Sequence, residues 1–348
     1  MEVLDNKCPS CGAKITFNPK NQRWDCEYCG SKYTLEEMQK YNNASSKKEN
    51  ESITPTGKKI DGLDVYRCKN CGAEVMADEQ TTSTFCVYCG STAILKDKIN
   101  EGISPSRIIP FKKVKEDAIT AFKGLSKGRP LMPKLFNDPK NLEKISGVYI
   151  PFWTYDLNVS GDIDFTAVDT KTWSDYNYSY TKTDTYLSKR NGNMEFNNIL
   201  VDASTRFDDD LMDSIEPFSL DELTEYNHAY LSGFLAEKYD VSVEDAKERA
   251  TSRAIQTAID VCKESVIHQT KTVANNNLVT KDNKNDYILL PVWMVNINYN
   301  NKKYTFAMNG QTGKLVGNIP LDIKKTVIIS IILFVVITLI SFGIIWKV

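Results

Sequence analysis

Eight cysteines in four C-x2-C pairs are the residues of this sequence best suited to chemistry. Within each half of the set, fourteen residues separate the two pairs. Zinc needs four ligands at the corners of a tetrahedron, and two such turns supply them. The spacing therefore predicts two structural zinc ions, one held by Cys8, Cys11, Cys26 and Cys29, the other by Cys68, Cys71, Cys86 and Cys89.

The two halves are a tandem repeat. K-C-P-S-C-G-A corresponds to R-C-K-N-C-G-A, and C-E-Y-C-G-S corresponds to C-V-Y-C-G-S. A glycine follows the second cysteine of every pair, where the backbone must turn beneath the metal and glycine tolerates a positive φ. Each half is therefore interpreted as a zinc ribbon, with these glycines at positions 12, 30, 72 and 90.

A closed set of four thiolates indicates a structural ion, because a catalytic zinc keeps one position open. The two histidines, His228 and His268, lie far from the cysteines in segments expected to be helical. Cys262 also falls in a helical pattern and is interpreted as a small apolar residue. None of these three residues is predicted to bind metal.

Residues 326–346 contain no charged side chain and would span about 31 Å as a helix, enough to cross a bilayer. Lys324 and Lys325 precede this segment, which favours a cytoplasmic location for the large N-terminal part. The start, MEVLDNKCPS, lacks the apolar stretch of a signal peptide. We therefore expect a single-pass protein of the cell membrane whose cysteines stay reduced and free to bind metal.

Charge decides between the partners that zinc ribbons commonly have. Residues 1–35 contain five Lys/Arg and four Asp/Glu, and residues 61–96 contain three and five. Four thiolates around zinc add further negative charge, whereas a nucleic-acid-binding module normally presents a basic face. Protein docking is therefore favoured, and membrane-tethered nucleic-acid binding is the alternative.

The chain divides by composition into five parts, and the largest is expected to be an α+β domain with an antiparallel sheet and packing helices. The expected parts are zinc ribbon 1 (1–35), a flexible linker with a short helix (36–60), zinc ribbon 2 (61–97), the α+β cytoplasmic domain (98–320) and the membrane anchor (321–348).

Helical signals occur at three places in the α+β domain. Apolar spacing predicts a helix over 115–126. The capping box S-L-D-E at Ser219 predicts a helix over 220–239, and Ser242 is expected to start another over 243–268.

Strand signals alternate with these helices. Residues 147–159 and 287–299 each contain P-x-W within an apolar run and continue into a hairpin-like stretch that contains Ala167 or Ala307. The match is short, and it predicts that one strand unit is duplicated. Tyr176, Tyr178 and Tyr180 alternate as on one face of a strand, and a tyrosine-covered sheet is favoured over an aromatic recognition surface.

No catalytic motif is complete. In N-G-Q-T-G-K-L the two glycines are too close for a phosphate loop and Leu315 replaces the hydroxyl residue, so a turn at Asn309-Gly310 is expected. The acidic run at 208–210 lacks the spacing of a calcium loop and suits a solvated loop or helix start. We therefore expect no enzyme; an active site within the α+β domain is the weakest of the three hypotheses.

Longer strings give a family resemblance over most of the chain: R-I-I-P-F, G-V-Y-I-P-F-W-T-Y-D, S-G-F-L-A-E-K-Y-D, P-V-W-M and Y-T-F-A-M-N-G-Q-T-G-K. With the cysteine pairs, they resemble Gram-positive bacterial membrane-anchored zinc-ribbon proteins, often labelled TFIIB-type zinc ribbon or, misleadingly, primosomal helicase-like. The resemblance implies a zinc-binding, membrane-tethered protein, with some relatives linked to membrane stress and to phage-shock-protein-A-like or stomatin/virion-core-like partners.

These observations lead to one functional hypothesis. We expect a membrane-anchored zinc-ribbon adaptor that docks or recruits cytoplasmic proteins at the membrane, with no small-molecule substrate.

Overall fold

The computed structural model describes residues 8–13, 15–45, 64–68, 74–77, 94–97, 104–125 and 127–345. The fold is α+β with antiparallel sheets, as predicted from the sequence. The N-terminal elements are β1 (Thr16–Asn18), β2 (Arg23–Asp25), β3 (Lys32–Tyr33), α1 (Leu35–Ser45), β4 (Asp64–Cys68), β5 (Glu74–Ala77) and β6 (Ile94–Asp97). The remaining elements are β7 (Arg107–Ile108), α2 (Lys115–Gly124), η1 (Lys134–Asn137), α3 (Pro139–Leu142), β8 (Ser146–Ser174), β9 (Ser179–Asp202), α4 (Asp209–Ile215), η2 (Leu220–Glu222), β10 (Thr224–Glu225), η3 (His228–Leu231), β11 (Leu235–Glu237), α5 (Val243–Glu264), β12 (Thr270–Asn276), β13 (Val279–Tyr299), β14 (Lys302–Asn309), β15 (Leu315–Gly317) and α6 (Ile323–Ile345).

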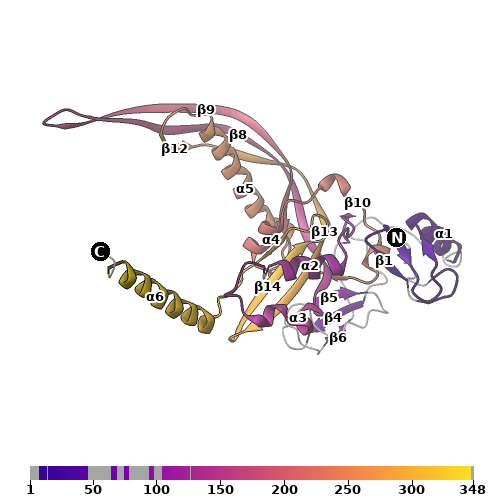
Figure 1. Cartoon of the computed structure of the whole chain (residues 1–348). Helices are drawn as coiled ribbons and strands as arrows, with labels where there is room; N and C mark the ends of the chain where they lie inside the picture. The colour runs from indigo at the N-terminus through magenta and orange to yellow at the C-terminus, as the bar shows by residue number, and fades with distance from the viewer. Residues whose placement is uncertain are drawn as a thin grey trace.

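Two long strands, β8 and β13, pair antiparallel at the centre of the large sheet (Figure 1). The sheet continues in the order β10-β7-β13-β8-β11-β5-β4-β6, with β9 and β12 also on β8 and with β14 and β15 beyond β13. The apolar runs 147–155 and 288–295 are buried on both faces, which explains why they do not alternate with polar residues. Helices α2 and α5 lie on one face, and α4 lies on the other.

The pairing of β8 with β13 places the two P-x-W blocks about a local two-fold axis. Ile150 pairs with Leu290, and the pairing runs symmetrically outward from there: Pro151 opposite Leu289 and Tyr149 opposite Pro291. Each block also pairs in parallel with a short strand, β8 with β11 and β13 with β7. The same sequence of elements, a short strand, a helix, a long strand and its hairpin partner, therefore occurs twice.

Hydrogen bonds repeat in the two halves and support the duplication expected from the sequence. Trp153 Nε1 donates to Val241 O just before α5, and Trp293 Nε1 donates to Lys113 O just before α2, both at 2.9 Å. The backbone hydrogen bonds match as well. Ala203 N donates to Pro151 O, and Gly310 N donates to Pro291 O in the same way. Val241 N then donates to Ala203 O, as Lys113 N donates to Gly310 O.

Both blocks continue into hairpins that contain Ala167 and Ala307, as predicted, but the two hairpins differ in length. Ala167 still lies in the long strand β8, whereas Ala307 lies in the partner strand β14. The two alanines are therefore not equivalent, because the hairpin of the first half is far longer than that of the second.

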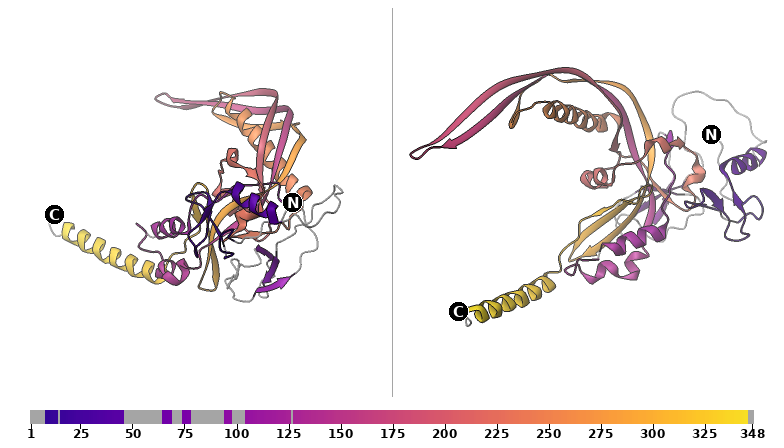
Figure 2. Two further views of the ribbon diagram at one scale, coloured as in Figure 1. Left: turned by 90° about the vertical axis from the view of Figure 1, so that its right-hand side faces the viewer. Right: turned by 45° about the horizontal axis from the view of Figure 1, so that its top comes forward.

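The extra length of that first hairpin forms a curved arm, which projects from the body in all three views (Figures 1 and 2). Strand β12 and helix α5 support the arm as far as Val168, where alternate residues Ile163, Phe165 and Ala167 pack against the end of α5. Beyond Thr170, whose N donates to Gln269 Oε1, β8 and β9 continue alone to the pair Ser174 and Ser179. The arm ends in a two-stranded ribbon with exposed side chains.

Aromatic residues gather at the tip of this arm. Tyr176 and Tyr178 lie in the turn and are exposed, so the expected alternation along one strand face is wrong for them; only Tyr180 lies in β9. Trp173 stacks on Tyr180 with ring centroids 5.6 Å apart. The tyrosines therefore do not cover a packed sheet.

The helix predicted over 220–239 is absent, and the chain there forms η2, β10, η3 and β11 instead. The capping box fails because its Glu222 pairs with Lys112 and Gln311, while Ser219 exchanges hydrogen bonds with the Gln311 side chain. Residues 235–237 then join the sheet beside β8. Tertiary contacts outweigh the local helix signal here.

The other helical predictions are confirmed, with small differences at their ends. Helix α2 ends at Gly124, and α5 begins after Ser242, whose Oγ accepts a hydrogen bond from Asp245 N (3.1 Å), and ends at Glu264. His268 therefore lies after the helix rather than in it. The 208–210 run starts α4, and Asn309-Gly310 starts the turn between β14 and β15, both as predicted.

Helix α6 projects away from the body of the protein (Figure 1). Its candidate membrane span, Ile323–Phe342, has a mean hydropathy of 2.5 and no residue buried within the protein. A core helix of a soluble domain would be mostly buried. This helix is long and apolar enough to cross a membrane.

Candidate metal centre

The first four cysteines lie on two loops around the small sheet β1-β2-β3. Cys8 and Cys11 precede β1, and Cys26 and Cys29 lie between β2 and β3. In each loop the glycine after the second cysteine closes the turn: Gly12 N donates to Cys8 O, and Gly30 N donates to Cys26 O. Both glycines have a φ of 73°, as predicted for these positions.

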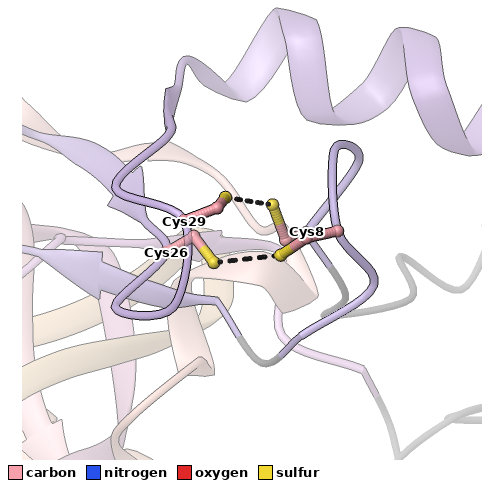
Figure 3. Close-up of side chains that lie close together, drawn as sticks. Cys8, Cys26 and Cys29 are labelled. Carbon is pink, nitrogen blue, oxygen red and sulfur yellow. Dashed lines mark hydrogen bonds between the residues drawn. The ribbon is translucent and has the colours of Figure 1, made fainter.

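The four sulfur atoms converge between these loops (Figure 3). Cys8 Sγ and Cys29 Sγ are 3.5 Å apart, and Cys11 Sγ and Cys26 Sγ are 3.6 Å apart. All four atoms lie within 4.8 Å of one another. A tetrahedral zinc ion with Zn–S bonds of about 2.3 Å would need sulfurs roughly 3.8 Å apart, so this set fits one metal ion.

Hydrogen bonds lower the pKa of two of these thiols. A hydrogen bond with Ser31 Oγ (3.2 Å) and the backbone N–H of the same residue lower the pKa of Cys29 to about 6. The pKa of Cys8 is lowered as well, although burial acts in the opposite direction, because Tyr33 Oη and nearby backbone N–H groups favour the thiolate. Two of the four thiols thus favour the thiolate, which is the form that binds a metal ion.

The pKa of the Cys11 thiol is raised to about 12. The backbone N–H of Ala13 lowers this pKa, but desolvation and the three neighbouring sulfur atoms outweigh that effect. Four thiolates at this distance repel one another, and a divalent cation would remove the repulsion. With every sulfur used as a ligand, the site can stabilise the fold but leaves no position for a substrate.

The loops of the first four cysteines together with β1, β2 and β3 form a unit, called the cysteine module below. Aromatic residues that were not singled out in the sequence fix this module to the α+β domain. Trp24, in β2, is 1% exposed and donates from Nε1 to Ala229 O (2.9 Å). Its ring packs with Phe17 and with Tyr230 of the domain, with centroids 5.0 Å and 5.2 Å away. Phe17 N also donates to Ser232 O. The available signal was a tryptophan flanked by charged residues in R-W-D, two residues before Cys26.

The second predicted set is described only at Cys68, whose backbone ends β4. Cys71, Cys86 and Cys89 lie outside the described residues. Strand β4 pairs antiparallel with β5 and β6, and β5 pairs with β11 of the domain. The backbone of this segment thus extends the large sheet.

Other candidate residues lie away from the cysteine cluster. His268 follows α5, where its Nδ1 is 2.9 Å from Asp169 Oδ2 and its ring stacks on Tyr186. Cys262 is on α5 beneath the arm, as predicted for a small apolar residue. His228 is the first residue of η3. Among the described residues, the four N-terminal cysteines are the group of His, Cys, Asp and Glu side chains arranged to bind a metal.

Comparisons with known proteins give one relative of similar length. No family model matches the chain, and no solved structure matches it. The chain is 35% identical over 329 residues to a protein of Bacillus subtilis (strain 168) described as uncharacterized protein YdjG, covering 93% of this chain and 92% of that protein. Identity at this level over nearly the full length of both proteins shows common ancestry. The chain therefore belongs to the same family as YdjG.

Proposed function

We propose that this chain is a membrane-anchored zinc-ribbon adaptor that recruits cytoplasmic proteins to the membrane, in the manner of the zinc-ribbon membrane-stress proteins that its sequence resembles. The role is non-catalytic. The cysteine module provides the docking surface, and α6 provides the anchor.

One observation carries this proposal: the cysteine module is attached to the domain by buried aromatic contacts and presents an exposed aromatic side chain. Trp24 is buried in the attachment, whereas Tyr28, between Cys26 and Cys29, is 84% exposed. The module lies at the opposite end of the molecule from α6 (Figure 1). Exposed tyrosines are frequent anchors in protein interfaces, so a partner bound at Tyr28 would be held at a fixed distance from the bilayer.

The docking role is tested by affinity purification of the full-length protein from membranes. Tyr28→Ala is expected to lose a cytoplasmic protein that the wild type recovers, while zinc content and thermal unfolding stay unchanged. Tyr41→Ala, on α1 and 41% exposed, is the matched control and should recover the same protein. Equal recovery with Tyr28→Ala would contradict docking at this module.

We propose zinc as the metal, with one ion in each cysteine set. Thiolate ligands in a tetrahedral arrangement favour zinc in proteins without redox function. Metal analysis of the purified protein should give two zinc ions per chain. Cys8→Ser and Cys68→Ser should each reduce the content to about one, because a missing thiolate opens the set. Cys262→Ser should leave it at two. One zinc ion in the wild type would contradict the second site.

We propose that α6 spans the cell membrane with the domain on the cytoplasmic side. Lys324 and Lys325, at the start of α6, support this orientation. Protease added to inside-out vesicles should remove the domain, and protease added to intact spheroplasts should not. The reverse pattern would overturn the orientation.

A further inference from the structure

The root of α6 is fixed to the body by the segment 127–132. Asp322 N donates to Leu131 O (2.8 Å), and Lys325 Nζ donates to Met132 O (2.6 Å). Asp322 Oδ1 in turn accepts a hydrogen bond from Lys325 N (3.2 Å) in the first turn of the helix. The body surface around residues 127–132 therefore lies where α6 would enter the bilayer.

An open groove of about 470 Å³ lies at this junction, between residues 128–132 and 317–321. Its volume is in the range of small-molecule sites in proteins. The side chains along it are mostly apolar, and Arg129 supplies its charge. The apolar members are Leu131, Met132, Ile319, Pro320 and Leu321.

Exposed cations surround the groove. Lys127 precedes it, Arg129 lines it, Lys134 follows it in η1, and Lys324 is the second residue of α6. Strand β14, which follows the turn after β13, adds Lys302 and Lys303 as its first two residues. This turn is held beside η1 because Phe136 packs on Tyr299 and Tyr304, with ring centroids 6.1 Å and 5.8 Å apart, and it lies near the start of α6 (Figure 1).

These six cations lack carboxylate partners within the described part of the chain. Two exposed lysines of the arm differ in this respect: Lys182 lies 2.9 Å from Asp184, and Lys189 lies 3.6 Å from Asp164. The acidic residue at the junction, Asp322, is already engaged with Lys325. The region where α6 leaves the domain thus presents six exposed cations without a carboxylate partner among the described residues.

We propose that this face binds anionic phospholipids of the bilayer that α6 spans. The cations contact the phosphate groups, and the groove accepts the upper part of an acyl chain. This inference assumes the membrane-spanning role of α6 but does not depend on the docking role of the cysteine module. The physical basis is charge complementarity: each Lys or Arg near an anionic membrane surface strengthens binding by a factor of about five.

The test uses the full-length protein in nanodiscs of phosphatidylcholine mixed with phosphatidylglycerol. Native mass spectrometry after release counts the lipids that stay bound. The wild type is expected to retain phosphatidylglycerol preferentially. The combined variant Arg129→Gln, Lys302→Gln, Lys303→Gln should weaken that preference by roughly tenfold to a hundredfold, since three such factors are removed. All three side chains are exposed, so the fold should be unaffected.

A matched variant removes the same number of charges from the arm: Lys171→Gln, Lys182→Gln, Lys189→Gln. It should retain the wild-type preference. Equal retention of phosphatidylglycerol by the Arg129 variant and the wild type would overturn the proposal, as would displacement of the lipid by inorganic phosphate, which would indicate a site for free phosphate. Failure of the wild type to enter nanodiscs would instead refute membrane spanning by α6, and the lipid site with it.

Discussion

At the scale of single residues, three tryptophans join different parts of the molecule by the same kind of hydrogen bond. Each indole is largely buried and donates from Nε1 to a backbone carbonyl in a different part of the chain. A buried carbonyl without a donor is costly, so each tryptophan both fills space and satisfies a polar group. The pairs are Trp24 with Ala229, Trp153 with Val241 and Trp293 with Lys113, all at 2.9 Å.

Trp24→Phe tests the attachment of the cysteine module. Phenylalanine keeps most of the packing but removes the indole donor to Ala229 O, which still accepts from Ser232 N, so the free energy of unfolding should fall by about 0.5–1.5 kcal/mol. Chemical denaturation provides the measurement. Trp173→Phe, at the exposed tip of the arm, is the control and should change stability little.

Asp169 makes the stability of the arm sensitive to acid. The backbone N–H of Gln269, followed by His268, lowers the pKa of this carboxyl below its ordinary value of 3.8. A lowered folded-state pKa means that the carboxylate contributes stability above about pH 4, and that this contribution is lost as the pH falls through the folded-state value. Asp169→Asn should therefore lower the melting temperature at neutral pH and flatten its decline below pH 4.

The exposed Asp210→Asn is the control for that experiment and should follow the wild-type curve at each pH. If the melting temperatures of the wild type and Asp169→Asn fell in parallel below pH 4, this would contradict the assignment of the acid sensitivity to Asp169.

The convergence of the first four cysteines was predictable residue by residue, whereas the attachment of their loops to the domain was not. The spacing of Cys8, Cys11, Cys26 and Cys29 determines the tetrahedral arrangement locally, and the positive φ after each pair requires glycine. The partner of Trp24 lies 205 residues away, and no local pattern in the sequence encodes a contact at that separation.

At the scale of elements, the arm depends on close contact between β8 and the turn that joins β12 to β13. Gly161, in β8, has a φ of 138°, and a methyl group there would overlap the carbonyl oxygen of Asn277 in that turn. Asn277 N also donates to Asp162 O (2.9 Å). The strand can pass this turn only because position 161 lacks a side chain.

Gly161→Ala should therefore loosen β12 from the arm and lower stability by about 1–3 kcal/mol. Hydrogen exchange of the amides of β12 should quicken more than that of β13 near Trp293. Gly192→Ala provides the control, since Gly192 pairs with Gly161 across the hairpin but has open space at its Cβ. If the amides of β12 exchanged hydrogen equally fast in Gly161→Ala and Gly192→Ala, this would contradict the role of the contact between Gly161 and Asn277.

Elements with a strong periodic signal were predictable, and those formed by long-range pairing were not. Helix α5 shows small residues at every fourth position, Ala246, Ala250, Ala254 and Ala258, all buried. The segment 220–239 also spaces its buried aromatics Tyr226, Tyr230 and Phe234 four residues apart, yet it is not helical. Its residues pack against the cysteine module and the sheet on several sides, so the period reflects two different partners rather than one helix face.

At the scale of the whole molecule, the two halves of the α+β domain are completed by each other. Strand β7 of the first half pairs with β13 of the second, and β11 of the second half pairs with β8 of the first. Each half thus supplies the short strand that pairs with the long strand of the other half. Each half also supplies the tryptophan that donates a hydrogen bond to the backbone just before the helix of the other half. The domain should therefore unfold as one unit.

Trp153→Phe and Trp293→Phe test this symmetry. Each removes one equivalent hydrogen bond between the halves and should lower the free energy of unfolding by a similar amount, about 1–3 kcal/mol. The two changes together should still give a single transition by circular dichroism and by tryptophan fluorescence. Two separate transitions would show that the halves are independent.

The exchange of strands and tryptophans between the halves also has a consequence for the order of events during synthesis. Lys113 and Trp293 are 180 residues apart in the chain. At roughly 5–20 residues per second, the ribosome needs on the order of ten seconds or more to supply the second half. During that interval the apolar strand β8 has no neighbour on its β13 side. Nascent chains of this family are therefore expected to need a chaperone until translation passes Tyr299, the last residue of β13.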